Sequence, residues 1–185
     1  MALVPLAGVD RTTLRWLRRT ERPAAFALLA GESAVAELEW SRVDGSLASG
    51  RTADAAWTLK RIGFLHPRLT VRAAPGGPDV ARVSIHLNYH RIELADGGAF
   101  RFHRAGLLVP AWKVSTEDGA ELLHVEPVRE GRRLVGGAVI ASDAGARAPE
   151  LPLLAIVSWY VIVLAWFEDE ALVPFEGPDA PAGAG

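Results

Sequence analysis

The chain has 185 residues, enough for one domain or for one domain with a short appendage. Its residues are 50% hydrophobic and 23% charged, which is ordinary for a globular protein and too apolar for a disordered chain. The net charge of −2 argues against a general nucleic-acid binder, which would carry a basic excess. The absence of cysteine excludes a disulfide framework, a thiolate metal site and a cysteine nucleophile.

The first segment of the chain to show a pattern is basic. Residues 10–22 are expected to form a short helix or an irregular lead-in, and residues 1–24 are therefore interpreted as preceding the folded domain. From Ala25 onward, apolar and polar residues alternate with the period of two that is typical of strands. This alternation predicts a first hairpin, with strands over 26–30 and 34–40 joined by a tight turn.

The alternation continues through the middle of the chain, interrupted by clusters of Gly, Pro and Asp that are typical of turns. About ten or eleven short strands, spaced roughly every 8–12 residues, are the pattern of an all-β domain. After the first hairpin, the predicted strands lie over residues 57–60, 68–72, 83–89, 92–94, 100–102, 112–114, 123–125 and 134–140.

A different pattern occupies residues 151–167, which are 17 residues without a charge. Pro149 and Pro152 mark its start, and proline is favoured in the first turn of a helix. The segment is therefore predicted to be one helix, and because it is apolar on every side, either protein or lipid must surround it. Beyond it, residues 171–175 are expected to form a further strand and residues 177–185 a disordered tail.

Two environments for this helix are weighed. A bilayer needs about 17–25 apolar residues, so 151–167 is short for a membrane span. A barrel of ten or more strands encloses more space than its own side chains fill, since about eight strands suffice for a filled barrel. We therefore favour a closed barrel around the buried helix. The alternatives are a tail-anchored membrane protein, with a cytosolic β domain and a transmembrane helix over 151–167, and a pair of buried strands suggested by the β-branched run 161–163.

A resemblance to a known family adds to this interpretation. Residues 57–72, an aromatic and basic strand followed by a glycine turn and a second basic strand, resemble bacterial members of the tubby-like superfamily. The apolar ending 151–160 resembles them too, and the likeness covers Phe26 to Phe175. That group includes the LURP-one-related proteins and the phospholipid scramblases. The resemblance implies a mainly β fold, a closed antiparallel barrel of about twelve strands around a hydrophobic C-terminal helix, with the domain over 25–176.

The candidate ligand-binding residues are Lys60, Arg68 and Arg72. If the strands 57–61 and 68–72 pair across their turn, the three side chains are neighbours on the outer surface, and no acidic residue lies in the stretch between them. Such a cluster could hold a phosphate or an anionic lipid head group, and a merely solvated face of the barrel is the alternative. Tubby domains bind phosphoinositide head groups at a basic surface site, but the sequence does not match that site residue by residue.

No motif for catalysis, metal binding or phosphate cradling is found. His86 and His90 would lie about 13 Å apart on one regular strand, too far to share a zinc ion. We therefore expect a non-enzymatic binding module without metal or cofactor, and without nucleic acid as a partner. The expected partner is anionic phospholipid or a membrane surface, and the expected location is the cytoplasm, peripheral to the inner face of the membrane.

Overall fold

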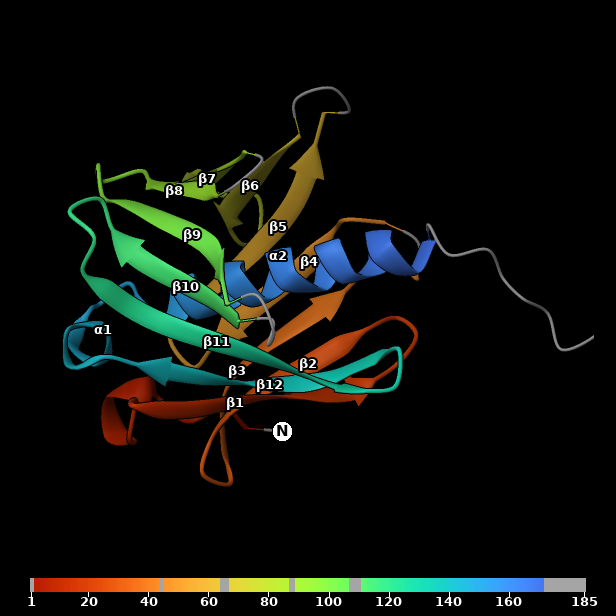
Figure 1. Ribbon diagram of the computed structural model, residues 1–185, viewed down its shortest axis with the longest axis horizontal. Coiled ribbons are helices and arrows are strands. Elements are labelled where there is room, and N and C mark those ends of the chain that lie inside the picture. The colour runs from red at the N-terminus through yellow and green to blue at the C-terminus, as the bar shows by residue number, and fades with distance from the viewer. Residues whose placement is uncertain (1, 44, 64–66, 87–88, 107–110, 172–185) are drawn as a thin grey trace, which may run out of the picture.

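The computed structural model describes residues 2–171, except for residues 44, 64–66, 87–88 and 107–110. Twelve strands form a closed barrel in which each strand pairs antiparallel with its neighbours in the chain and the first strand pairs with the last (Figure 1). The predicted mainly β fold with a closed antiparallel barrel is thus confirmed. The strands are β1 (Thr13–Thr20), β2 (Ala25–Ala30), β3 (Ser33–Trp40), β4 (Ala48–Thr52), β5 (Ala56–Ile62), β6 (Arg68–Ala73), β7 (Asp79–Ile85), β8 (His90–Leu94), β9 (Ala99–Ala105), β10 (Ala111–Thr116), β11 (Glu121–Glu130) and β12 (Arg133–Ala141). A 3-10 helix, η1 (Leu6–Gly8), precedes the strands, and the helices α1 (Asp143–Arg147) and α2 (Leu151–Ala171) follow them.

The first strand corrects the prediction for residues 10–22. Neither a short helix nor an irregular lead-in forms there, because Thr13–Thr20 is β1 and pairs with β2 on one side and β12 on the other. Both neighbours satisfy its backbone hydrogen bonds, and the buried Leu14 and Trp16 alternate with the exposed Thr13 and Arg15. The barrel therefore begins ahead of residue 25 and includes part of the predicted lead-in.

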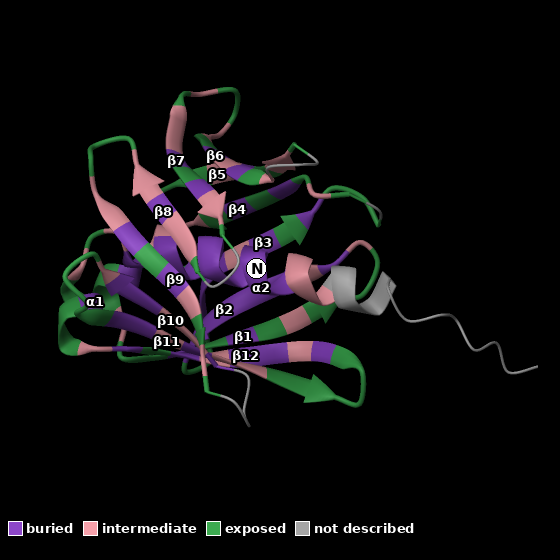
Figure 2. Ribbon diagram, turned by 45° about the horizontal axis from the view of Figure 1, so that its top comes forward, coloured by how far each residue is buried: buried purple, intermediate pink, exposed green. Residues whose placement is uncertain are grey.

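The residues ahead of β1 also pack against the barrel. The backbone N–H of Val4 donates to the carbonyl of Ala34 over 2.8 Å. Leu3 packs against a small cluster on β2 and β3 that consists of Ala27, Leu29 and Ala34. These two strands are consequently buried on both faces over much of their length (Figure 2).

Two further details of the barrel differ from the sequence prediction. β4 is a strand that was not predicted, and its Gly50 lies so close to α2 that a Cβ atom there would stand 2.8 Å from Cγ2 of Ile156. The predicted strand 83–89 is displaced toward the N-terminus, because β7 runs from Asp79 to Ile85. Beyond its end, the N–H of His86 donates to the carbonyl of Tyr89 over 3.0 Å.

The apolar segment near the C-terminus is one helix, α2, rather than a pair of strands, and it is four residues longer than predicted, ending at Ala171 instead of Phe167. The predicted strand 171–175 is wrong at Ala171, which is helical, and its other residues lie outside the described part of the chain, as does the predicted tail 177–185. Within the described residues, no helix is both long and apolar enough to cross a membrane. The tail-anchor interpretation requires such a helix over 151–167.

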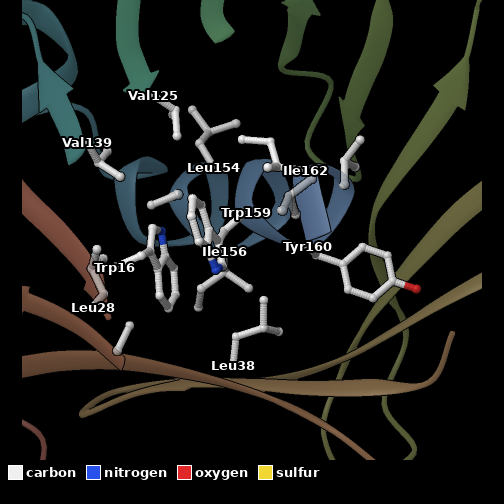
Figure 3. Close-up of a cluster of buried hydrophobic side chains, with 14 of the residues drawn as sticks. Trp16, Leu28, Leu38, Val125, Val139, Leu154, Ile156, Trp159, Tyr160 and Ile162 are labelled. Atoms are coloured by element: carbon white, nitrogen blue, oxygen red, sulfur yellow. The ribbon is translucent and has the colours of Figure 1, made fainter. Parts of the chain in front are cut away.

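Side chains from both the helix and the strands form the main hydrophobic cluster. Trp159 of α2 stacks on Trp16 of β1 with ring centroids 5.7 Å apart, and Tyr160 stacks on Trp40 of β3 at 5.4 Å. Figure 3 shows side chains of α2 facing those of several strands around them. The labelled residues of this cluster are Trp16, Leu28, Leu38, Val125, Val139, Leu154, Ile156, Trp159, Tyr160 and Ile162.

Candidate anion-binding face

The hairpin of β5 and β6 determines where the predicted site residues lie. Lys60 is directly opposite Thr70, and Arg68 and Arg72 lie two residues to either side of Thr70 along β6. Because side chains alternate between the two faces of a strand, the three basic residues share one face with Thr70. The buried Leu69 and the equally buried Val71 take the opposite face, so the three basic side chains lie on the outer surface of the barrel.

The next strand adds two charged residues that the sequence prediction missed. Arg82 of β7 lies opposite Thr70, on the side away from Lys60. Asp79 of the same strand accepts a hydrogen bond from Nε of Arg72 over 2.8 Å and pairs with Arg82 at 3.1 Å. Hydrogen bonds from Arg72 and then Arg82 hold the pKa of Asp79 below its usual range, so the carboxylate is charged at neutral pH. Arg72 is therefore part of an ion-pair group rather than an uncompensated cation.

The other two predicted residues differ from Arg72. Lys60 and Arg68 are exposed, and neither forms an ion pair with any residue that the structure describes. They lie diagonally across the β5–β6 ladder, a placement that leaves side chains about 7–8 Å apart. We call Lys60, Arg68, Arg72 and Arg82, with Thr70 between them, the β5–β7 basic face. Lys60 and Arg68 each add a charge that has no carboxylate partner among the described residues, whereas Arg72 and Arg82 share the one carboxylate of Asp79.

A surface hollow of about 390 Å³ lies beside this face, between β7, β8 and the turn that leads into β9. Its two cations both have carboxylate partners. Arg82 pairs with Asp79, and Arg91 pairs with Glu93 at 3.1 Å and with Glu117 at 2.7 Å. The hollow is therefore balanced in charge, and an anion is attracted more strongly to the Lys60 and Arg68 side of the sheet.

The histidine prediction rested on a regular strand that the structure does not have. His86 lies in the turn between β7 and β8, where its ring stacks on Tyr89 with centroids 4.7 Å apart, and His90 is the first residue of β8. In the part of the chain that is described, no group of three or more His, Cys, Asp or Glu residues could hold a metal ion. The predicted absence of metal, of cofactor and of enzymatic activity stays a prediction.

The two acidic residues of the β10–β11 turn have structural partners. Glu117 lies in the β10–β11 turn and pairs with Arg91, as given above. In the same turn, the Thr116 hydroxyl donates to Asp118, and this bond lowers the pKa of Asp118. The first contact joins the β10–β11 turn to β8, and the second lies within the turn itself.

Comparisons with protein-family models, with characterised proteins and with solved structures found no match for this chain. The tubby-like resemblance is therefore untested by them, and it rests on the residues quoted from the sequence.

Proposed function

We propose that the protein is a non-enzymatic binding module that attaches to anionic phospholipid surfaces through the β5–β7 basic face. The observation that carries this proposal is the pair Lys60 and Arg68, two exposed cations on adjacent strands with no carboxylate partner in the described chain. Lipid phosphates are bound by such cations through charge-assisted hydrogen bonds, and Thr70 adds a hydroxyl group between them.

The proposal includes a tubby-like architecture, in which the barrel closes around α2 as its core. Burial supports it, since Leu154, Trp159 and Tyr160 of α2 each expose 0% of their surface. Contacts to several strands support it too, because the helix stacks on β1 through Trp159 and on β3 through Tyr160. In this architecture the helix is a structural element, and membrane contact falls to the outer face of the strands.

The charge of the whole chain limits how strongly the protein binds. With a net charge of −2, attraction to an anionic surface is local to the basic face. A basic residue close to such a surface contributes about 1 kcal/mol, and that contribution falls off within a Debye length. Binding is therefore expected to be weak, reversible and released by salt. Salt release also separates this proposal from a tail anchor, which salt does not extract.

Vesicle flotation of the full chain tests the proposal. We expect the protein to float with phosphatidylserine-containing vesicles at low salt, to be released at moderate salt, and not to float with neutral vesicles. The double variant Lys60→Gln with Arg68→Gln should bind roughly tenfold or more weakly, because two uncompensated charges are lost. Asp79→Asn should bind more tightly, because it leaves Arg72 and Arg82 without their carboxylate.

A matched control removes the same charge from the other side of the barrel. Arg15 and Arg19 are exposed on β1, five strands from β6 in the order of the barrel. Arg15→Gln with Arg19→Gln should leave flotation almost unchanged. Equal recovery with neutral and anionic vesicles, or equal losses in the two double variants, would contradict the proposal.

A further inference from the structure

The outer surface of three adjacent strands, β11, β12 and β1, carries exposed apolar side chains. Val128, Ile140 and Leu17 expose 51%, 43% and 38% of their surface, and they are three of the seven large apolar residues that are exposed in the described chain. Their neighbours along the strands, such as Val139 and Trp16, expose 1% or less and fill the inside of the barrel. Because side chains alternate between the two faces of a strand, the three exposed residues point outward.

The register of the strands arranges this surface in three rows, and each row has its middle residue on β12. Named from β1 through β12 to β11, the rows are Thr13, Ile140 and His124; Arg15, Ala138 and Glu126; and Leu17, Gly136 and Val128. We call these nine residues the β12 face. Two of its three middle residues are Ala138 and Gly136, so a second surface can approach β12 closely there.

The two sides of the β12 face carry complementary groups at the same level. Arg15 on β1 is exposed and forms no ion pair with any residue that the structure describes. Glu126 on β11 has a side chain that is 47% exposed, and its partner in the described chain is Nε2 of His124, 3.1 Å away. In the row of Leu17 and Val128, both sides are apolar. A cation and a leucine on one side therefore stand level with a carboxylate and a valine on the other.

We propose that the β12 face binds the β12 face of a second copy of this chain, with a two-fold axis that runs along β12. Most homodimers have such an axis, and sheets that pack face to face keep their strands nearly aligned. Rotation about this axis leaves every row at its own level and exchanges β1 with β11. Arg15 of one copy then faces Glu126 of the other, and Leu17 faces Val128, and each of these contacts occurs twice.

The charges select this axis over the alternative. A two-fold axis across the strands would place β1 against β1, so Arg15 would face Arg15 and Glu126 would face Glu126. Like charges opposed in this way disfavour association, whereas opposite charges favour it and fix the register. The pattern of the β12 face thus matches its own copy in one orientation.

The size of the face sets the strength of the dimer. Nine residues a side are fewer than the ~20–30 of a standard stable interface, so the dimer should be weak and reversible. We expect a dissociation constant of roughly 10–100 μM.

The dimer does not rest on lipid binding. β6 is the sixth strand from β12 in both directions around the barrel, so the β5–β7 basic face lies on the opposite side of the molecule (Figure 1). The basic faces of the two copies point away from each other, and substitutions in the β12 face leave them intact.

Sedimentation equilibrium of the full chain tests the proposal. Between about 1 μM and about 1 mM, a range that brackets the expected constant, the mean mass should rise from that of a monomer toward that of a dimer. Moderate salt should weaken the association, because two exposed ion pairs contribute to it. A chain that stays monomeric throughout would overturn the proposal and leave the β12 face to a different protein or to solvent.

Charge reversal tests the orientation. Arg15→Glu should weaken the dimer at least tenfold, because carboxylates then face each other at both contacts. Glu126→Arg should weaken it to a similar extent by opposing two cations. An equimolar mixture of the two variants should dimerise as the wild type does, since each copy then offers the charge that the other lacks. Arg68→Glu is the matched control on the opposite side of the barrel and should leave the dimer unchanged.

An uncharged variant provides a second measurement, which decides the question if either charge reversal fails to fold. Val128→Ser removes the apolar contact with Leu17 at both places and should weaken the dimer roughly tenfold. Thermal unfolding of every variant is measured alongside. Single reversals that dimerise like the wild type, a mixture of folded variants that stays monomeric, or an unchanged dimer in Val128→Ser would overturn the proposal.

Discussion

Gly137 shows how tightly the helix fits against the strands. A Cβ atom at this position of β12 would lie 2.8 Å from Cζ3 of Trp159 and 2.7 Å from the backbone carbonyl oxygen of Glu126. Neither neighbour can yield easily, because the indole of Trp159 is itself stacked on Trp16 and the carbonyl belongs to a strand. The close approach of this position to the helix requires a residue without a side chain.

Gly137→Ala should therefore lower the free energy of unfolding by about 1–3 kcal/mol, the usual cost of overpacking a core. Chemical denaturation of the variant and the wild type measures it. The exposed turn glycine Gly119, where a Cβ atom would meet nothing within 4 Å, is a poor control because its φ of 95° strains any other residue. Ala138→Ser on the same strand is a better one and should cost well under 1 kcal/mol. Equal effects of the two substitutions would contradict the packing described.

Because of His90, the free energy of unfolding depends on pH. Burial, with a smaller contribution from His86, lowers the pKa of His90 from 6.5 to about 4 in the folded protein, so the unfolded chain binds more protons between these two values. Stability therefore falls as the pH drops from about 6.5 toward 4, by no more than roughly 3 kcal/mol for this one residue. A comparison of the wild type with a His90 variant isolates the contribution of this histidine.

His90→Phe should consequently lose less stability than the wild type over that range of pH. Thermal unfolding of the two proteins at pH 7, 5.5 and 4 measures the difference. Parallel losses of stability in the wild type and the variant would show that His90 does not titrate as described.

At the scale of the elements, the strands whose large apolar residues alternate with polar ones were predictable from the sequence, and β4 was not. β6, with Leu69 and Val71 between basic residues, carries the alternation clearly. β4 reads Ala-Ser-Gly-Arg-Thr, which has no large apolar side chain, because Gly50 sits against Ile156 and leaves no room for one. The proximity of α2 requires glycine at this position, and the local sequence pattern of β4 does not show that α2 is near.

The same reasoning explains β1 and the end of α2. Leu14 and Trp16 do alternate with polar neighbours, but the many basic residues of the segment obscured the strand pattern. At the other end of the chain, residues 168–171 contain Glu and Ala, which are good helix formers. No proline lies between Pro152 and Pro174 to end the helix earlier. Helix propensity therefore carried α2 beyond the point where the apolar run stops.

The part of the candidate site that lies within a single hairpin could be predicted from the sequence. Alternation and one hairpin turn place Lys60, Arg68 and Arg72 on a common face. Asp79 was missed because it comes from a third strand, and the register shifts by a bulge at Arg72 before the two residues meet. A small pocket of about 90 Å³ between β5, β8 and α2, with His90 in its lining, could not be predicted, since it depends on the position of α2 relative to the two strands.

At the scale of the whole molecule, the proposed lipid contact through the strands assumes a barrel that closes around α2. Burying one Leu, Ile or Val side chain contributes about 1.5–3 kcal/mol. Seven such residues of α2 are buried, so their summed contribution, about 10–21 kcal/mol, is as large as the ~5–15 kcal/mol of net stability that a domain has. A barrel without its helix would also leave the indole of Trp16 without its stacking partner.

Removal of the helix is the most direct measurement. A chain that ends at residue 148 should lack the near-ultraviolet circular dichroism of a packed aromatic core and should show no cooperative thermal unfolding. Ile162→Asp, a single carboxylate at a position that is 3% exposed, should be nearly as damaging because the charge would have no water around it. If the truncated chain keeps its aromatic dichroism and unfolds cooperatively at the temperature of the full chain, the strands do not need α2, and the barrel is not built around it.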